Sequence, residues 1–203
     1  MTEQKKKQLP VWQESILLVA TAMVMAIIVK TFFLQAFYIP SESMEPTMLV
    51  NDKILVQKVS YWGGDVKRGD VVVFDDPGGW LSAEDSKHAS NPVQKALETV
   101  GLFPTGGHLI KRVVGVGGDR IAVRDGHVVR NGKLQSESFT AACAGGQGCD
   151  LPRAITVPQG YVFCMGDNRG ASDDGRFWGP IPVDWVIGGA FATYWPPKRI
   201  GTL

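Results

Sequence analysis

The feature that most constrains this chain of 203 residues is an apolar segment near its start, from Ile16 to Phe37. A helix that spans a bilayer needs about 20 residues, and this segment is that long. Lys5, Lys6 and Lys7 precede it. Because positive residues beside a span stay in the cytoplasm, we expect a cytoplasmic N-terminus over residues 1–15 and a single-pass cell-membrane protein whose remainder is extracytoplasmic. A cleaved secretory signal is the alternative, but this apolar run is long for one and no clean small-residue site follows it, so we favour an uncleaved anchor over 16–37.

Composition separates the rest of the chain from helical bundles and from nucleic-acid binders. The 21 Lys and Arg nearly balance the 20 Asp and Glu, and the net charge of +1 offers no basic field for a nucleic acid. The 24 Gly and 12 Pro, with short apolar runs, favour many short strands joined by turns. We therefore predict a mainly β domain after the anchor, with strands at 52–59, 71–74, 109–114, 121–124, 127–130, 154–157, 161–165 and 183–192. Asp125-Gly126 is a favoured hairpin turn between two of these strands.

One region interrupts this strand-rich pattern. From Trp80 to Gly107 the chain is polar and irregular, and we interpret it as a surface excursion. Pro92–Val100 is a candidate for one short helix within it, with Asn91 as the N-cap.

The three cysteines have different surroundings. Cys143 and Cys149 bracket a glycine-rich loop that is short and flexible enough to let them meet, and an exported domain is an oxidising environment, so we expect a disulfide. Cys164 lies in a strand-like run and is expected to be a buried apolar side chain. No CxxC or HExxH pattern appears, so no metal site is predicted.

Lys111 is a candidate general base. Alternate side chains of a strand share a face, so either Lys111 or its neighbour Arg112 meets apolar surroundings. A desolvated lysine can lose its proton, which arginine does not, and a neutral amine can then take the proton of a hydroxyl. The alternative is that Lys111 lies on the exposed face, as most strand lysines do.

A candidate nucleophile lies just beyond the anchor, in the stretch Ser41–Thr47. Glu45 precedes Pro46 and is therefore biased towards extended geometry, which predicts a bent, non-helical segment that presents its side chains outward. Serines beside a proline are also common in linkers. A Gly-x-Ser-x-Gly elbow is missing from the sequence, which argues against the commonest serine hydrolase layouts.

Four stretches, taken together, carry a family resemblance. Ser43–Thr47, Gly69–Phe74, Lys111–Asp119 and Gly166–Arg176 follow the anchor in this order. They resemble the signature boxes of bacterial type I signal peptidases (leader peptidases), a Ser-Lys dyad family, in its compact form with a single anchor. One box alone is weak evidence, but four in order are specific. The last box departs from the family pattern at Gly175, where a Ser is common, and at Gly170-Ala171, which replace polar residues.

The resemblance implies a membrane-bound serine endopeptidase that removes signal peptides from exported preproteins by cutting after a small-x-small site. Ser43 matches the nucleophile and Lys111 the general base. The Ser41 hydroxyl matches the group that forms the oxyanion hole with the Ser43 amide. Ser172 matches the serine that orients the lysine. The remaining matched positions form or adjoin a supporting charged pair: Asp174, Arg176 and Asp167.

The resemblance also implies an antiparallel β fold with a substrate bound as an extended strand. Residues 38–119 and 163–203 would form the catalytic domain, and 120–162 a small β insertion with the disulfide loop. From their proximity to the dyad in sequence, Phe37, Ile39 and Leu109 are hypothesised to wall the shallow substrate pockets. The expected partners are preproteins and the bilayer, with the secretion machinery left open. No cofactor is expected.

Two other readings remain open at this point. One is a Ser-Lys protease that cleaves itself or one dedicated partner. The other is a membrane-tethered, non-catalytic β domain.

Overall fold

The computed structural model describes residues 10–61, 65–76, 79–80, 108–143 and 148–203. The predictions made for Lys5–Lys7 and for a helix at Pro92–Val100 lie outside the described residues.

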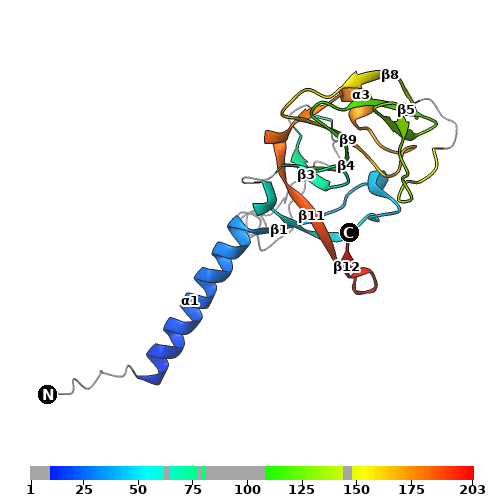
Figure 1. Cartoon of the computed structure of the whole chain (residues 1–203). Coiled ribbons are helices and arrows are strands. Elements are labelled where there is room, and N and C mark those ends of the chain that lie inside the picture. Colours follow the sequence, from blue (N-terminus) through cyan, green and yellow to red (C-terminus); the bar gives the residue numbers. More distant parts are fainter. Residues whose placement is uncertain (1–9, 62–64, 77–78, 81–107, 144–147) are drawn as a thin grey trace.

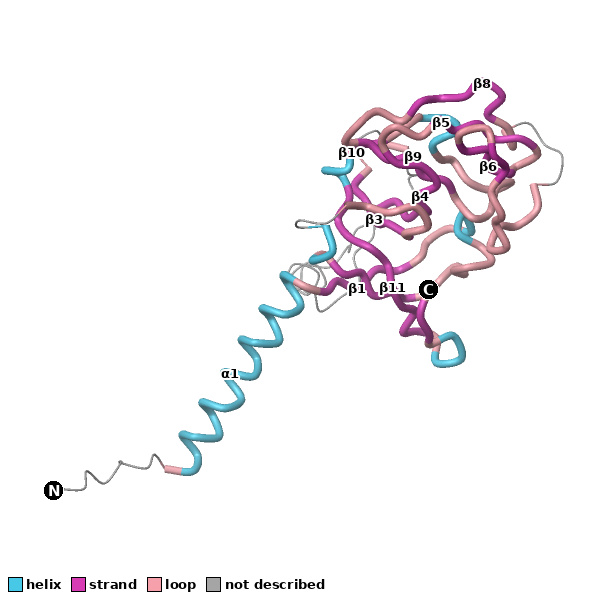
Figure 2. Tube along the Cα trace, viewed as in Figure 1, coloured by secondary structure: helices cyan, strands magenta, loops and turns pink. Residues whose placement is uncertain are grey.

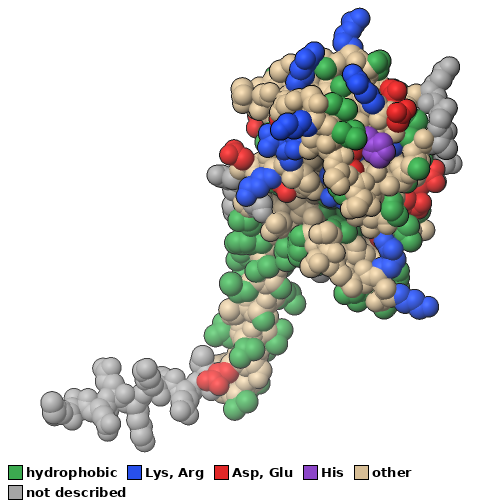
Figure 3. Space-filling view, turned by 45° about the vertical axis from the view of Figure 1, so that its right-hand side comes forward, with side chains coloured by type: hydrophobic (Ala, Val, Ile, Leu, Met, Phe, Trp, Pro, Cys, Tyr) green, Lys and Arg blue, Asp and Glu red, His purple; other side chains and the backbone are tan. Residues whose placement is uncertain are grey.

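Helix α1, Val11–Phe32, projects away from the β domain (Figure 1). Its apolar side chains are exposed along its length (Figure 3), and Val11–Val29 is long and apolar enough to cross a membrane. The predicted anchor boundaries of 16–37 are wrong at both ends. Residues Leu34–Tyr38 form strand β1 and not the end of the helix. The prediction was wrong because an uninterrupted apolar run does not by itself distinguish a helix from a buried strand.

Most strands belong to one antiparallel sheet of eight (Figure 2). Its order is β1-β2-β11-β3-β4-β9-β10, and β12 pairs with β11. The bounds of the strands that follow β1 are Lys53–Gln57 (β2), Val71–Asp75 (β3), His108–Val116 (β4), Tyr161–Met165 (β9), Ile181–Pro182 (β10), Val186–Trp195 (β11) and Gly201–Thr202 (β12).

A second antiparallel sheet of four strands has the order β7-β6-β5-β8. Its strands are Arg120–Arg124 (β5), His127–Arg130 (β6), Lys133–Leu134 (β7) and Leu151–Thr156 (β8). Asp125 and Gly126 join β5 to β6 with φ angles of 50° and 76°, which confirms the predicted hairpin turn.

Short helical turns connect these strands. They are the 3-10 turns Glu42–Met44 (η1), Val59–Tyr61 (η2), Val183–Trp185 (η3) and Pro197–Arg199 (η4), and the α-helix Gly175–Trp178 (α3). The sequence did not predict α3, β7, β10 or β12, since elements of two to four residues carry no hydrophobic period.

Three buried clusters stabilise the two sheets. One gathers Phe37, Ile39 and Met44 with residues of β2 and β3. A second joins β3, β4 and β9, and a third fills the space between β9 and the smaller sheet. Strand β4 contributes Ile110 to the first cluster and Leu109 to the second. This is expected, because neighbouring side chains of a strand point to opposite faces of the sheet.

Candidate active site

Strand β4 and turn η1 bring together a lysine and a serine. Lys111 Nζ lies 2.7 Å from Ser43 Oγ. Only 3% of Lys111 and 8% of Ser43 are exposed, so the strand presents the lysine inward, not to solvent. Burial penalises the charged form of an amine, and a neutral amine within hydrogen-bonding distance of a hydroxyl can accept its proton.

Turn η1 sets the direction of Ser43. The segment was predicted to be non-helical, but Glu42–Met44 forms a single 3-10 turn that ends at Glu45, whose φ of −67° and ψ of 143° are extended, as expected for a residue before proline. The side chain of Glu42 is exposed, so this carboxylate lies in solvent beside the buried Ser43.

The loop after β9 holds the same turn from the other side. Asn168 donates from its backbone N–H to the Ser43 carbonyl at 3.1 Å and from Nδ2 to the Glu42 carbonyl at 3.2 Å. Asn168 lies within the last family box, but these contacts with the turn could not be predicted from the sequence.

Ser41 lies beside Ser43 and Lys111. Its hydroxyl donates to Ser43 Oγ at 3.3 Å, and the side chain is half-buried. A hydroxyl at this distance from Ser43 Oγ is near enough to donate to a negative oxygen that forms next to that atom.

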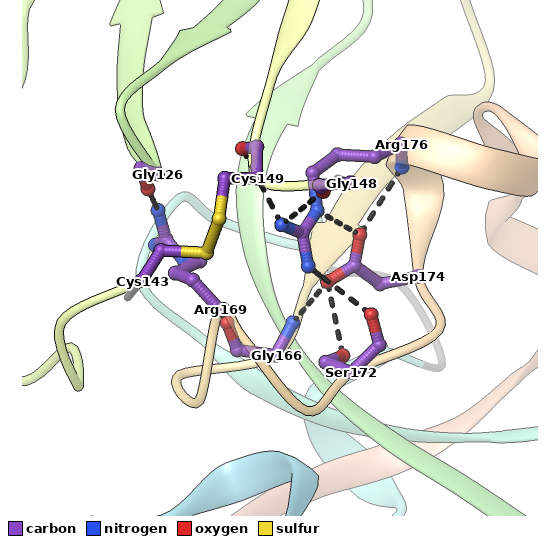
Figure 4. Close-up of a disulfide and its surroundings, with 9 residues drawn as sticks. All are labelled: Gly126, Cys143, Gly148, Cys149, Gly166, Arg169, Ser172, Asp174 and Arg176. Carbon is purple, nitrogen blue, oxygen red and sulfur yellow. Dashed lines mark hydrogen bonds and ion pairs between the residues drawn. A yellow bond between two sulfur atoms is a disulfide. The ribbon is translucent and has the colours of Figure 1, made fainter. Parts of the chain in front are cut away.

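Ser172, Asp174 and Arg176 form one buried network (Figure 4). Ser172 Oγ donates to Asp174 Oδ2 at 3.0 Å, and the Gly166 N–H donates to the same oxygen at 3.0 Å. Arg176 binds both carboxylate oxygens, each at 2.9 Å. The exposed fractions of the two charged side chains are 0% and 1%, so the pair is closed to solvent.

Gly166 explains how this network reaches Ser43. A Cβ at this position would overlap the Ser172 hydroxyl and the carbonyl oxygen of Ser43. Ser172 and the carbonyl group of Ser43 therefore both pack against the same side of the Gly166 Cα, where the side chain of another residue would lie. The glycine is needed here for close approach, since its φ is not positive.

Asp167 belongs to a second ion pair, with Arg112, which the sequence did not predict. Arg112 binds its two oxygens at 2.8 and 2.7 Å, and Thr47 Oγ1 donates to it at 2.5 Å. Asp167 is fully buried and Arg112 is 12% exposed in its side chain. The neighbours Lys111 and Arg112 thus serve different partners, Ser43 and Asp167, as their alternation along β4 would predict.

The three hypothesised pocket residues do not form one wall. Phe37 and Ile39 lie in the same buried cluster as Met44, next to Ser43 in sequence. Leu109 packs in the second cluster, with Val113 and Cys164. His108 occupies the Phe37 side instead, with its ring edge-on to Phe37 at 5.2 Å between centroids.

The structure joins Cys143 and Cys149 in a disulfide, and Cys164 is fully buried, as predicted for an apolar side chain. Burial raises the pKa of the Cys164 thiol, and the charge of Asp174 raises it further. Cys164 is therefore not a nucleophile at neutral pH.

Comparison with known proteins identifies the family of the chain. A family model described as "Signal peptidase, peptidase S26" matches residues 12–195. The probable signal peptidase I-2 of Synechocystis is 35% identical over 98% of this chain and 82% of its own length. Signal peptidase I of Leptolyngbya laminosa is 34% identical over 94% of this chain and 83% of its own length.

Among solved structures, a signal peptidase I from Enterococcus faecalis matches 62% of this chain and 96% of its own chain, with 23% identity and a TM-score of 0.40. The family model and the relatives of similar length establish that this chain belongs to the signal peptidase family, peptidase S26.

Proposed function

We propose that this protein is a membrane-anchored serine endopeptidase that removes signal peptides from exported preproteins, with Ser43 as nucleophile and Lys111 as general base. The observation that carries the site assignment is the 2.7 Å separation of Lys111 Nζ and Ser43 Oγ in a buried setting. Family membership supports the reaction, and α1 supports the anchor.

The proposed reaction follows from these positions. Neutral Lys111 takes the proton of Ser43 as Oγ attacks the carbonyl carbon of the scissile bond. The Ser41 hydroxyl and the Ser43 amide stabilise the negative oxygen that forms. Lys111 then gives the proton to the leaving amine of the mature protein. The neutral Lys111 next activates a water molecule, which hydrolyses the ester bond between the signal peptide and Ser43.

The remaining groups are proposed to position these residues. Asp174 and Arg176 hold Ser172 beside Gly166. Arg112 and Asp167 hold Thr47, which follows the turn Glu42–Met44, called the catalytic turn from here on. Phe37 and Ile39 are proposed to line the pockets for small side chains, since they share a cluster with Met44.

We propose the orientation that the sequence predicts, with a cytoplasmic N-terminus and an extracytoplasmic catalytic domain. The predicted division of that domain, 38–119 and 163–203 around an insertion at 120–162, is shifted here to follow the large sheet, which begins with β1 at Leu34 and resumes with β9 at Tyr161. The smaller sheet, whose strands lie between Arg120 and Thr156, supports an insertion between these two parts.

The test uses the full chain in detergent and an exported precursor with a small-x-small site. We expect one cut after that site, lost in Ser43→Ala and in Lys111→Met. Lys133→Met is the matched control, because Lys133 is an exposed lysine of β7, and it should cut normally. Cutting at the wild-type rate by either dyad variant would overturn the assignment. Activity on only one precursor, or only on the chain itself, would favour the dedicated protease.

A further inference from the structure

A hollow of about 550 Å³ opens beside Ser172, between the disulfide and the loop that follows β9. Figure 4 shows three of its lining residues, Cys143, Cys149 and Ser172, with the Asp174–Arg176 pair beside them. The described residues that line it include Cys143, Cys149, Asn168, Ser172, Asp173 and Phe177. The mechanism above gives this space no role.

Two residues that line the hollow also pack against the turn Glu42–Met44. Asn168, which lines the hollow, holds the carbonyl groups of Glu42 and Ser43, and Ser172 lies against the same Gly166 as the Ser43 carbonyl. A peptide bound in this hollow would therefore end next to Ser43.

The hollow and the proposed small-residue pockets lie on different sides of Ser43. Phe37 and Ile39 belong to β1 and to the segment that runs from it into the catalytic turn, and β1 is at one end of the large sheet. Asn168 and Ser172 follow β9, which lies beyond β4 towards the other end. An extended chain that is cut at Ser43, with the residues before the cut against Ile39, can continue towards Asn168 and Ser172.

The charges around the hollow favour one sign of ligand. Arg169 lines it, but both of its terminal nitrogens bind Glu137, at 3.1 and 2.7 Å, which neutralises the guanidinium. Asp173 is exposed, and within the described residues its carboxylate has no ion-pair partner. Asp173 therefore leaves the hollow with a negative charge.

The hollow also offers an aromatic contact. Phe177 is 60% exposed although it belongs to α3, whose first turn is held by the buried Asp174. Its ring can cover the apolar stem of a long side chain, while Asp173 meets the charged end of that side chain.

We propose that this hollow binds the first residues of the mature protein, which follow the cut bond, and that Asp173 makes it select basic over acidic side chains there. The proposal rests on the peptidase function proposed above. It assigns Asp173 and Phe177 to substrate selection.

The first test compares three precursors that are identical except for Lys, Gln or Glu at the second mature position. An exposed ion pair changes the rate by roughly two- to fivefold, so we expect kcat/KM to fall by about this factor from Lys to Glu. Asp173→Asn should level the preference, and Asp173→Lys should reverse it. Asp184→Lys makes the same change of net charge at an exposed position outside the hollow and should keep the wild-type preference.

The second test combines a variant of the hollow with a substrate that is too short to reach it. We expect Phe177→Ala to lower kcat/KM several-fold for the long precursor that carries Lys. It should have no effect on a peptide that ends one residue after the cut. Equal losses on both substrates would mean that Phe177 acts through folding or through the dyad, and would overturn its role in the hollow.

The outcomes separate this proposal from the peptidase function. Cutting that depends on Ser43, with the same Lys-to-Glu preference in wild type and Asp173→Lys, would overturn the hollow and leave the function intact. A shift of equal size in Asp184→Lys would show a general charge effect and would also overturn it. Absence of cutting by the wild type on every precursor would overturn both.

Discussion

Lys111 Nζ and Ser43 Oγ lie 2.7 Å apart, although 68 positions separate the two residues in the chain. Strand β4 carries the amine, and the turn after β1 carries the hydroxyl. Folding of the large sheet therefore brings the amine and the hydroxyl together. Substitutions at this pair test proton transfer, and substitutions around it test the packing that holds the pair in place.

Activity should fall as the pH drops. Only the neutral form of Lys111 can take the proton of Ser43, so kcat/KM should decrease tenfold per pH unit on the acid limb, where the amine is protonated. The profile is measured on one precursor across the pH range in which the protein stays folded. Lys111→Arg should be inactive at every pH, because a guanidinium keeps its proton. An active Lys111→Arg variant would contradict the role of base.

Gly166→Ala should lower kcat by more than tenfold. The new methyl group would overlap the Ser172 hydroxyl and the Ser43 carbonyl, and the catalytic turn must shift to make room. Steady-state kinetics and a thermal melt of the same preparation separate misplacement from unfolding. Gly201→Ala is the matched control, because a Cβ there meets open space, and normal kinetics are expected for it.

Removing Asp174 should destabilise the fold strongly. Asp174→Ala leaves Arg176 buried without its counter-charge, and breaking such a pair costs about 3–5 kcal/mol of the free energy of unfolding. Denaturant titration followed by fluorescence measures this loss. Adding Arg176→Met to Asp174→Ala should recover part of it, since the uncompensated charge disappears. Asp184→Ala, at an exposed site, should stay within about 0.5 kcal/mol of wild type.

Acid should weaken the link between the two sheets at Asp119. Burial raises the pKa of Asp119, but hydrogen bonds from Arg68, the Val116 N–H and Asn131 outweigh it, so the pKa lies below its usual 3.8. A carboxylate with a lowered pKa stabilises the folded state above the unfolded pKa, and that contribution is lost as the pH falls through the folded pKa.

Asp119→Asn should therefore lower the free energy of unfolding by about 1–3 kcal/mol at neutral pH. The difference in stability between the variant and the wild type should become smaller as the pH approaches 3. Melting temperatures across this range provide the measurement. The exposed Asp125→Asn should follow the wild-type curve. A gap between Asp119→Asn and wild type that stays constant with pH would contradict the assignment.

The sequence predicted the mainly β domain well, because its longer strands carry alternating or continuous apolar runs. The Asp125-Gly126 hairpin was predictable for a different reason, since its left-handed φ angles demand those residue types. The end of α1 was not, because Leu34–Tyr38 is as apolar as the helix before it and only pairing with β2 reveals it as a strand.

The candidate site was predictable in its residues and not in its contacts. Order along the chain pointed to Ser43 and Lys111, but no pattern shows that Arg112 binds Asp167 or that Asn168 holds the Ser43 turn. These are contacts between elements far apart in sequence. Leu109 illustrates the same limit, since nearness to Lys111 in sequence says nothing about which cluster its side chain joins.

The passage from α1 into β1 has a mechanical consequence. A single residue, Phe33, separates the helix from the strand, and its carbonyl accepts a hydrogen bond from Lys58 at the end of β2. With α1 as the anchor, no flexible linker separates the membrane span from the strand that leads to the catalytic turn, so the distance of this turn from the bilayer is restricted. The number of residues between the apolar core of a signal peptide and its cut site would then have to match that distance.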